Sequence, residues 1–179
     1  MSLSLVFVSG GIKMYNELTE DDIKKMEEEI EYRRVVLRKE LLEDVKEARA
    51  HGDLSENFEY HAAKKDKNQH ESRIRYLERM IKTAKIVSDT SREDEVGINN
   101  TVTLYMEDDD EEEVYKLVTS IRGNSMHNMI STESPLGKAI LRHKVGERVL
   151  VKASDTYSYY VVIKKIENTS DFGDEIRKF

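Results

Sequence analysis

Apolar residues recur at helical spacing in two long stretches of the first half of the chain. The first set follows intervals of three or four residues, with one interval of seven near Arg33 and Arg34: Ile23, Met26, Ile30, Leu37, Leu41, Val45 and Ala48. The second set is Ala62, Ile74, Leu77, Ile81, Ala84 and Val87. This spacing places apolar side chains along one face of a helix. The pattern therefore predicts two long helices that pack as an antiparallel coiled coil, roughly 45 Å long at 1.5 Å per residue.

Capping residues predict where the two helices begin and end. Thr19, followed three residues later by Asp22, predicts the start of the first helix. Gly52 can end it in a left-handed conformation. Asp53 and Glu56 then have the spacing of a helix start, with Asp53 as the N-cap residue and Glu56 at the third helical position. In this interpretation the two carboxylates are structural, although they lie at the far end of the hairpin from any core.

The pattern changes from helical spacing to alternation in the second half of the chain. Four segments alternate as half-buried strands do, at residues 101–106, 114–118, 148–152 and 159–166. The acidic run 107–113 is interpreted as a solvated hairpin loop, because blocks of like charge usually stay in water. Ser134 followed by Pro135 predicts a short helix between the second and third strands. The predicted fold class is α+β, with an antiparallel sheet and one short helix in the second domain.

These patterns divide the chain into five parts. Residues 1–16 are interpreted as an N-terminal extension, either disordered or derived from a tag. The helical hairpin occupies residues 17–88, with an acidic tip at 52–57, and the polar segment 89–98 is a linker. The small sheet domain covers residues 99–168. The tail, 169–179, has no structural assignment.

Composition and charge exclude several classes of function. The chain of 179 residues carries a net charge of -7, which argues against a protein that reads duplex DNA with a basic face. It has no cysteine, so disulfides and thiolate metal sites are excluded. No stretch of the sequence is apolar for long enough to span a bilayer. We therefore expect a soluble protein without membrane contact. We also expect it to be cytoplasmic and to be a monomer.

Two separated segments carry a resemblance to a known family. Residues 48–57, continuing through 59–64, and residues 130–139, followed by 144–147, resemble the two motifs of the bacterial Gre transcript cleavage factors, GreA type. The resemblance implies an N-terminal coiled coil and an FKBP-like C-terminal domain. It also implies binding to bacterial RNA polymerase at the rim of its secondary channel. There the factor would stimulate the polymerase's own cleavage of backtracked RNA 3′ ends, without being an enzyme itself.

The resemblance also implies roles for four residues at the tip. Asp53 and Glu56 would assist catalysis by holding a Mg²⁺ shared with the polymerase active site and by helping to activate water. This metal would bind weakly and only in the polymerase complex, so none is expected to be bound tightly in the free protein. Arg49 and Lys64 would contact the extruded RNA 3′ end. For Tyr60, packing against the helices is favoured over stacking on an RNA base.

Other interpretations remain open at this stage. Phe58 stands where the family is expected to have alanine, which makes the tip bulkier. A zinc site at His51 and His61 is not favoured, because no compact ligand spacing supports it. The chain could be a channel-binding paralogue that inhibits transcription, although it keeps both Asp53 and Glu56. A third hypothesis, a peptidyl-prolyl isomerase, rests on the FKBP-like fold alone and ranks last.

Overall fold

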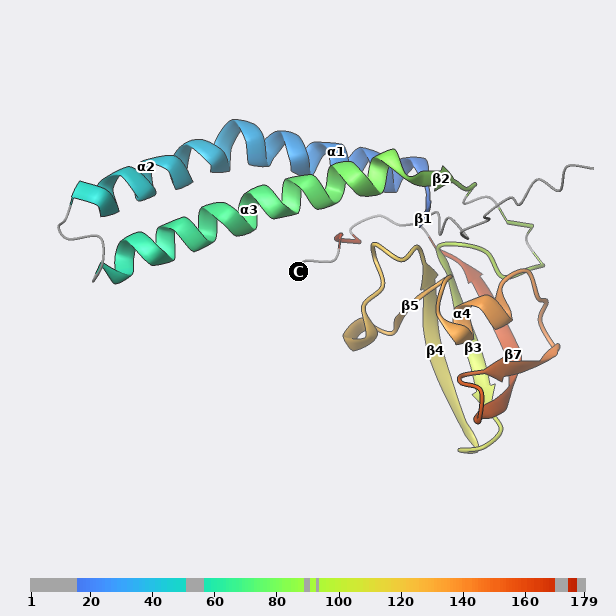
Figure 1. Ribbon diagram of the computed structural model, residues 1–179. Coiled ribbons are helices and arrows are strands. Elements are labelled where there is room, and N and C mark those ends of the chain that lie inside the picture. The colour runs from blue at the N-terminus through green and yellow to red at the C-terminus, as the bar shows by residue number, and fades with distance from the viewer. Residues whose placement is uncertain (1–15, 51–56, 89–90, 93, 170–173, 177–179) are drawn as a thin grey trace, which may run out of the picture.

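A long helical hairpin extends from one side of a small sheet domain (Figure 1). The computed structural model describes residues 16–50, 57–88, 91–92, 94–169 and 174–176. The hairpin contains β1 (Asn16–Leu18), α1 (Glu20–Tyr32), the π-helix η1 (Arg33–Leu37), α2 (Arg38–Ala50), α3 (Phe58–Lys82) and β2 (Ala84–Ile86). None of the helices in these residues is long and apolar enough to cross a membrane.

The first helix starts where the sequence predicts. The Asp22 backbone N–H donates to Thr19 Oγ1 at 3.2 Å, and the Thr19 N–H donates to Asp22 Oδ2 at 3.0 Å, which completes a capping box. The seven-residue interval in the apolar pattern falls on η1, where each turn takes up more residues than in an α-helix. Val35 and Val36 within it are 48% and 37% exposed. The interruption in the sequence pattern is therefore a widened turn inside one continuous helical arm.

The second helix is shorter than predicted. Thr83 is the C-cap residue of α3, and Ala84–Ile86 forms β2, which pairs in parallel with β1. Assigning Ala84 and Val87 to the helix was therefore wrong. The physical reason is a tertiary contact. Residues 84–86 become a strand because they pair with β1, which the hairpin brings beside them. The predicted hairpin arrangement itself is present (Figure 1).

The second domain is a five-stranded sheet covered by one helix. Its strands are β3 (Asn100–Met106), β4 (Glu111–Val118), β5 (Met129–Ser131), β6 (Arg148–Lys152) and β7 (Ser158–Asn168), in the order β5-β4-β3-β7-β6. The 3-10 helix η2 (Ser125–His127) precedes β5, and α4 (Pro135–Ile140) packs next to β6. The α+β class is confirmed. The strands pair antiparallel except for β5, which joins β4 in parallel and was not predicted.

The acidic run is only partly a loop. Residues 111–113 belong to β4 and pair with β3, with Glu111 opposite Met106. Interpreting all of 107–113 as a hairpin loop was therefore wrong. Their side chains are exposed, so the strand satisfies its backbone hydrogen bonds in the sheet while the carboxylates remain in water.

The hairpin and the sheet domain share one apolar cluster at their junction. Leu18, Met26 and Leu77 of the hairpin are fully buried there together with Ile121, which follows β4. Ile176 from the tail packs against the same cluster. Ile176 belongs to the tail, which has no assignment from the sequence pattern, and it thus lies at the base of the hairpin. The junction therefore joins the base of the hairpin to the sheet domain.

Candidate functional site

The side chain of Asn57 joins the two helices of the hairpin near its tip. The helix α2 ends at Ala50, and α3 begins at Phe58 with Asn57 as its N-cap residue. Predicting Asp53 as the N-cap residue, with Glu56 at the third helical position, was therefore wrong. Asn57 Oδ1 accepts the Tyr60 N–H at 2.9 Å, and Asn57 Nδ2 donates to the Ala48 carbonyl at 2.6 Å. A carboxylate at the cap could accept the first bond but could not donate the second.

The two predicted catalytic carboxylates, Asp53 and Glu56, lie outside the described residues, as do Gly52 and His51. Their assigned roles in catalysis and magnesium binding therefore stay predictions. The described structure bears on them in one respect. Because Asn57 caps α3, the start of that helix needs neither carboxylate.

The two predicted RNA-binding residues lie together on the ring of Tyr60. The Arg49 guanidinium carbon is 5.5 Å from the ring centroid, and Lys64 Nζ is 5.8 Å from it. Lys64 follows Tyr60 by one helical turn, and Arg49 comes from the last turn of α2. We call Arg49, Tyr60 and Lys64 the basic cluster. Both cations are exposed and Tyr60 is half-buried, so the cluster lies at the surface. Each cation is within cation–π distance of the Tyr60 ring.

The charges of the basic cluster also act on the Tyr60 hydroxyl. A hydrogen bond from Arg49 lowers the pKa of this phenol from its usual value of 10.0, and the nearby charge of Lys64 acts in the same direction. Burial opposes this lowering only in part. The site therefore favours negative charge. In the free chain the Tyr60 ring contacts these two cations, and the choice between packing and stacking on an RNA base stays a prediction.

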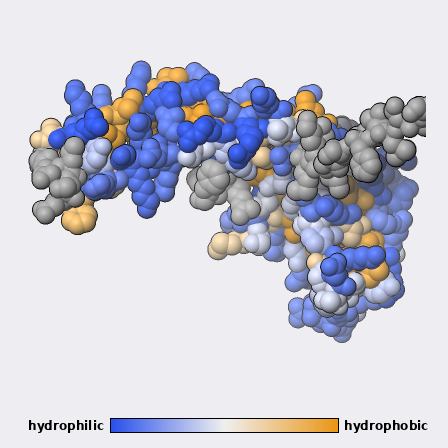
Figure 2. Space-filling model, viewed as in Figure 1, coloured by the Kyte–Doolittle hydropathy of each residue, from blue (hydrophilic) through white to orange (hydrophobic). Residues whose placement is uncertain are grey.

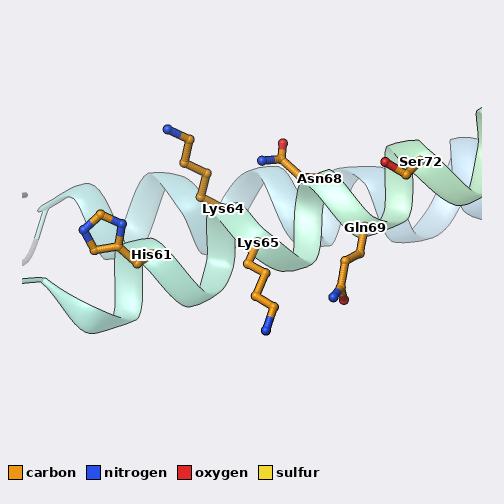
Figure 3. A pocket seen from close by; sticks show the side chains of 6 residues that line it. All are labelled: His61, Lys64, Lys65, Asn68, Gln69 and Ser72. Carbon is orange, nitrogen blue, oxygen red and sulfur yellow. The ribbon is translucent and has the colours of Figure 1, made fainter. Parts of the chain in front are cut away.

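A groove continues from the basic cluster along α3. It has a volume of about 730 Å³ and is lined by His61, Lys64, Lys65, Asn68, Gln69 and Ser72. Figure 3 shows Lys64 and Asn68 pointing to one side of the helix and Lys65 and Gln69 to the other. The surface of the hairpin around it is mainly hydrophilic (Figure 2). With one lysine and one amide on each side of the helix, the groove suits an anionic chain such as a phosphate backbone.

Metal ligation finds no support in the described part of the chain. There, no group of three or more His, Asp or Glu side chains could hold a metal ion. His51 lies outside the described residues, so the zinc interpretation is not tested. His61 contacts the Tyr60 ring edge-on, with the ring centroids 5.6 Å apart. Phe58, at the first position of α3, is 87% exposed and adds an apolar group beside the tip.

The second sequence motif forms a tight turn in the sheet domain. The Ser134 hydroxyl donates to the Ser131 carbonyl at 2.7 Å and accepts the Gly137 N–H at 3.0 Å, which confirms the predicted start of α4. A Cβ added at Gly137 would lie 2.0 Å from the Ser131 carbonyl oxygen. Only glycine allows the helix to approach the strand this closely. The motif is therefore a rigid, surface-exposed corner.

This corner borders an open hollow on the sheet domain. The hollow has a volume of about 1160 Å³ and lies between η2, the end of β5 and the tail. Met126, at the tip of η2, is 91% exposed on its rim, and Asp174 and Ile176 contribute from the tail. A large apolar side chain next to a rigid corner is a reasonable contact surface for a protein partner.

Comparisons with known proteins cover nearly all of the described chain. A family model described as transcription elongation factor, N-terminal, matches residues 16–86, and a model described as transcription elongation factor, GreA/GreB, C-term, matches residues 91–168. Transcription elongation factor GreA of Caldanaerobacter subterraneus subsp. tengcongensis is 47% identical over 136 residues, covering 75% of this chain and 87% of the relative. GreA of Streptococcus pneumoniae is 41% identical over 154 residues, covering 86% and 96%. A solved structure of the transcription factor Gfh1 aligns at 25% identity and a TM-score of 0.42, covering 85% of this chain and 97% of that chain.

Proposed function

The chain belongs to the GreA/GreB family of transcription elongation factors, and on this premise we propose that it stimulates RNA cleavage by bacterial RNA polymerase. In this proposal the hairpin enters the secondary channel, and its tip meets the RNA 3′ end that backtracking has extruded. The observation that carries the proposal is the basic cluster. Two cations lie on one aromatic ring at the end of α2 and the start of α3, next to the connection that contains Asp53 and Glu56.

Asp53 and Glu56 are the proposed catalytic contribution of this chain. Their donor chemistry fits Mg²⁺, which prefers hard carboxylate oxygens and keeps several of its waters. Two carboxylates do not complete a coordination shell, so the polymerase and the RNA phosphate would supply the remaining ligands. When bound, Mg²⁺ supplies Lewis-acid stabilisation of the phosphate and a more acidic water. The two side chains would orient this ion and accept a hydrogen bond from the attacking water.

The basic cluster and the groove on α3 are the proposed contacts to RNA. Arg49 and Lys64 would each form a charge-assisted contact to the phosphate backbone, and Lys65 adds a cation on the other side of the helix. Because the chain as a whole carries a net charge of -7, this attraction is local. It would hold the RNA end without general affinity for nucleic acid.

The rigid corner at Ser134 is proposed to dock on the polymerase. Its hydrogen bonds fix the backbone before binding, so little conformational entropy is lost on association. The apolar Met126 side chain beside it can be buried by the partner. The chain would thus bind through its sheet domain and act through its tip, as an accessory factor whose partner performs the cleavage.

The test uses a stalled, backtracked elongation complex of bacterial RNA polymerase with labelled RNA. We expect the wild-type chain to release short 3′ fragments rapidly in the presence of Mg²⁺. The variant Asp53→Asn with Glu56→Gln should bind the complex but lose this stimulation. A matched control, Glu43→Gln with Glu47→Gln, removes two exposed carboxylates from α2 and should behave as the wild type.

Three other outcomes would contradict the proposal. Loss of polymerase binding in the Asp53→Asn, Glu56→Gln variant would make the tip carboxylates structural. No release by the wild type, together with a block on nucleotide addition, would support an inhibitory, channel-binding paralogue. Catalysis of prolyl isomerisation in a model peptide, without any effect on the elongation complex, would support the isomerase hypothesis.

A further inference from the structure

The side chain of Asn57 forms hydrogen bonds to both arms of the hairpin. Its Nδ2 donates to the carbonyl of Ala48 in α2 at 2.6 Å, and its Oδ1 accepts the N–H of Tyr60 in α3 at 2.9 Å. The backbone carbonyl of Asn57 also accepts the His61 N–H at 3.2 Å. One residue is therefore bonded to the last turn of one helix and to the first turn of the next. Figure 1 shows that these two helix ends lie next to each other.

The bond to Ala48 is more than an ordinary helix cap. Carbonyls in the last turn of a helix lack an intrahelical partner, and a capping side chain normally serves only the helix that it begins. Here the Asn57 amide serves both helices. Ala48 is only 6% exposed, so its carbonyl lies in the seam between α2 and α3. Aspartate, serine and threonine can all cap α3, but aspartate has no proton to donate to Ala48, and the hydroxyl of serine or threonine is shorter than the amide arm.

We propose that Asn57 is a positioning residue for the tip, and this inference rests on the proposed function. By joining Ala48 to the start of α3, its side chain sets the distance between the end of α2 and the start of α3. The connection that contains Asp53 and Glu56 runs between these two helix ends. A catalytic group gains most from a fixed geometry, and small displacements from that geometry are costly in rate. Asn57 thus restricts the separation of the two described helix ends before the polymerase is bound.

The test separates this cross-bond from the cap. Asn57→Asp and Asn57→Ser both keep an acceptor for the Tyr60 N–H and lose the bond to Ala48, one with an added charge and one without. Asn57→Ala loses both bonds. With the stalled elongation complex, we expect Asn57→Asp and Asn57→Ser to lower the maximal rate of RNA release about ten- to hundredfold. They should also raise the Mg²⁺ concentration needed for half of that rate. The factor concentration that gives half of the effect should not change, because docking uses the sheet domain.

A second measurement needs no polymerase. The chain has no cysteine, so cysteines placed at Glu47 and Glu59 give two unique sites for spin labels on the two arms. We expect a narrow distribution of label distances in the chain with Asn57 and a broad one after Asn57→Ser. This distance measurement gives a result even if the wild-type chain does not stimulate cleavage. Failure of the inference and failure of the proposed function are therefore distinguishable.

Three results would overturn the inference. The first is wild-type activity and Mg²⁺ dependence in Asn57→Asp and Asn57→Ser while Asn57→Ala is impaired, which would leave Asn57 as a cap alone. The second is an unchanged distance distribution in Asn57→Ser. A broadened distribution with an unchanged maximal rate would likewise remove the positioning role, because the cross-bond would then have no effect on the chemistry.

Discussion

The Arg122 guanidinium and the Asp22 carboxylate approach to 2.7 Å at the junction of the two domains, and both side chains are fully buried. The contact is an ion pair without hydrogen-bond alignment, because Arg122 Nε and Asp22 Oδ1 do not meet the geometry of such a bond. The other carboxylate oxygen accepts hydrogen bonds from the Thr19 N–H at 3.0 Å and from Thr119 Oγ1 at 2.7 Å. One carboxylate therefore caps α1 and holds the hairpin to the sheet domain.

Replacing Arg122 by methionine should lower the free energy of unfolding by about 3–5 kcal/mol, because it leaves the Asp22 charge buried without its partner. Urea unfolding followed by circular dichroism measures this change. The matched control is Lys85→Met, which breaks the exposed pair with Glu17 and should cost no more than about 1 kcal/mol. If the two variants lose the same free energy of unfolding, the buried pair at the junction contributes no more to stability than the exposed pair.

The tail should stabilise the same junction. Asp174 Oδ2 lies 2.7 Å from Lys116 Nζ and 3.1 Å from Arg122 Nη1, and these three side chains are mostly buried. Asp174→Asn should therefore lower the free energy of unfolding by about 1.5–3 kcal/mol, the usual range for hydrogen bonds to charged groups. Differential scanning calorimetry of this variant beside Asp155→Asn, an exposed aspartate in the turn after β6, tests the prediction. A loss no larger than that of the control would contradict it.

Local signals in the sequence predicted most of the elements. Thr19 with Asp22 and Ser134 with Pro135 mark helix starts through short-range hydrogen bonds, which depend on few neighbours. The strands of the sheet follow from alternation, apart from β5. These features could be found because the physical cause lies within a few residues of the effect.

Features that depend on distant partners could not be predicted in this way. The strand β2 exists because β1 lies beside it, and the sequence 84–86 alone continues the helical pattern. Asp174 looked like one more acidic residue of a polar tail, and only the fold places it on Arg122. At the tip, the spacing of Asp53 and Glu56 suggested a helix start that was wrong, although a stronger signal for the start was present in the sequence. That signal was Asn57, a strong N-cap residue directly before the helical run.

His70 should make the hairpin sensitive to mild acid. Burial lowers the pKa of its imidazole from the usual 6.5, the charges of Arg33 and Arg38 add to the lowering, and Glu71 opposes it. Neither ring nitrogen has a partner with full hydrogen-bond geometry. Because the folded state binds fewer protons than the unfolded state, the stability from this group is complete above about pH 6.5 and falls as the pH drops below that value.

Melting temperatures at about pH 7.5 and about pH 5.5 test this, since most carboxylates stay ionised over that range. The wild type should melt at a lower temperature at the acidic value, and His70→Leu should remove part of this difference. His70→Leu should also be no less stable than the wild type at neutral pH, because it places an apolar group where two buried ring nitrogens lacked well-aligned hydrogen bonds. The control, His143→Gln, changes a partly exposed histidine of the sheet domain. An unchanged pH dependence in His70→Leu would exclude His70 as its source.

Arg49 should contribute to RNA contact without being indispensable. Arg49→Ala removes one of two cations that lie on the Tyr60 ring, so we expect stimulation of RNA cleavage to fall about three- to tenfold and to remain measurable. The dependence of the half-maximal factor concentration on salt should also become less steep, by about one unit on logarithmic axes, because one phosphate contact is lost. Lys46→Ala is the matched control, since it removes an exposed cation from the same helix away from the Tyr60 ring. If Arg49→Ala and Lys46→Ala keep the same rate and salt dependence as the wild type, Arg49 has no part in binding RNA, and the basic cluster is a structural contact between the two helices.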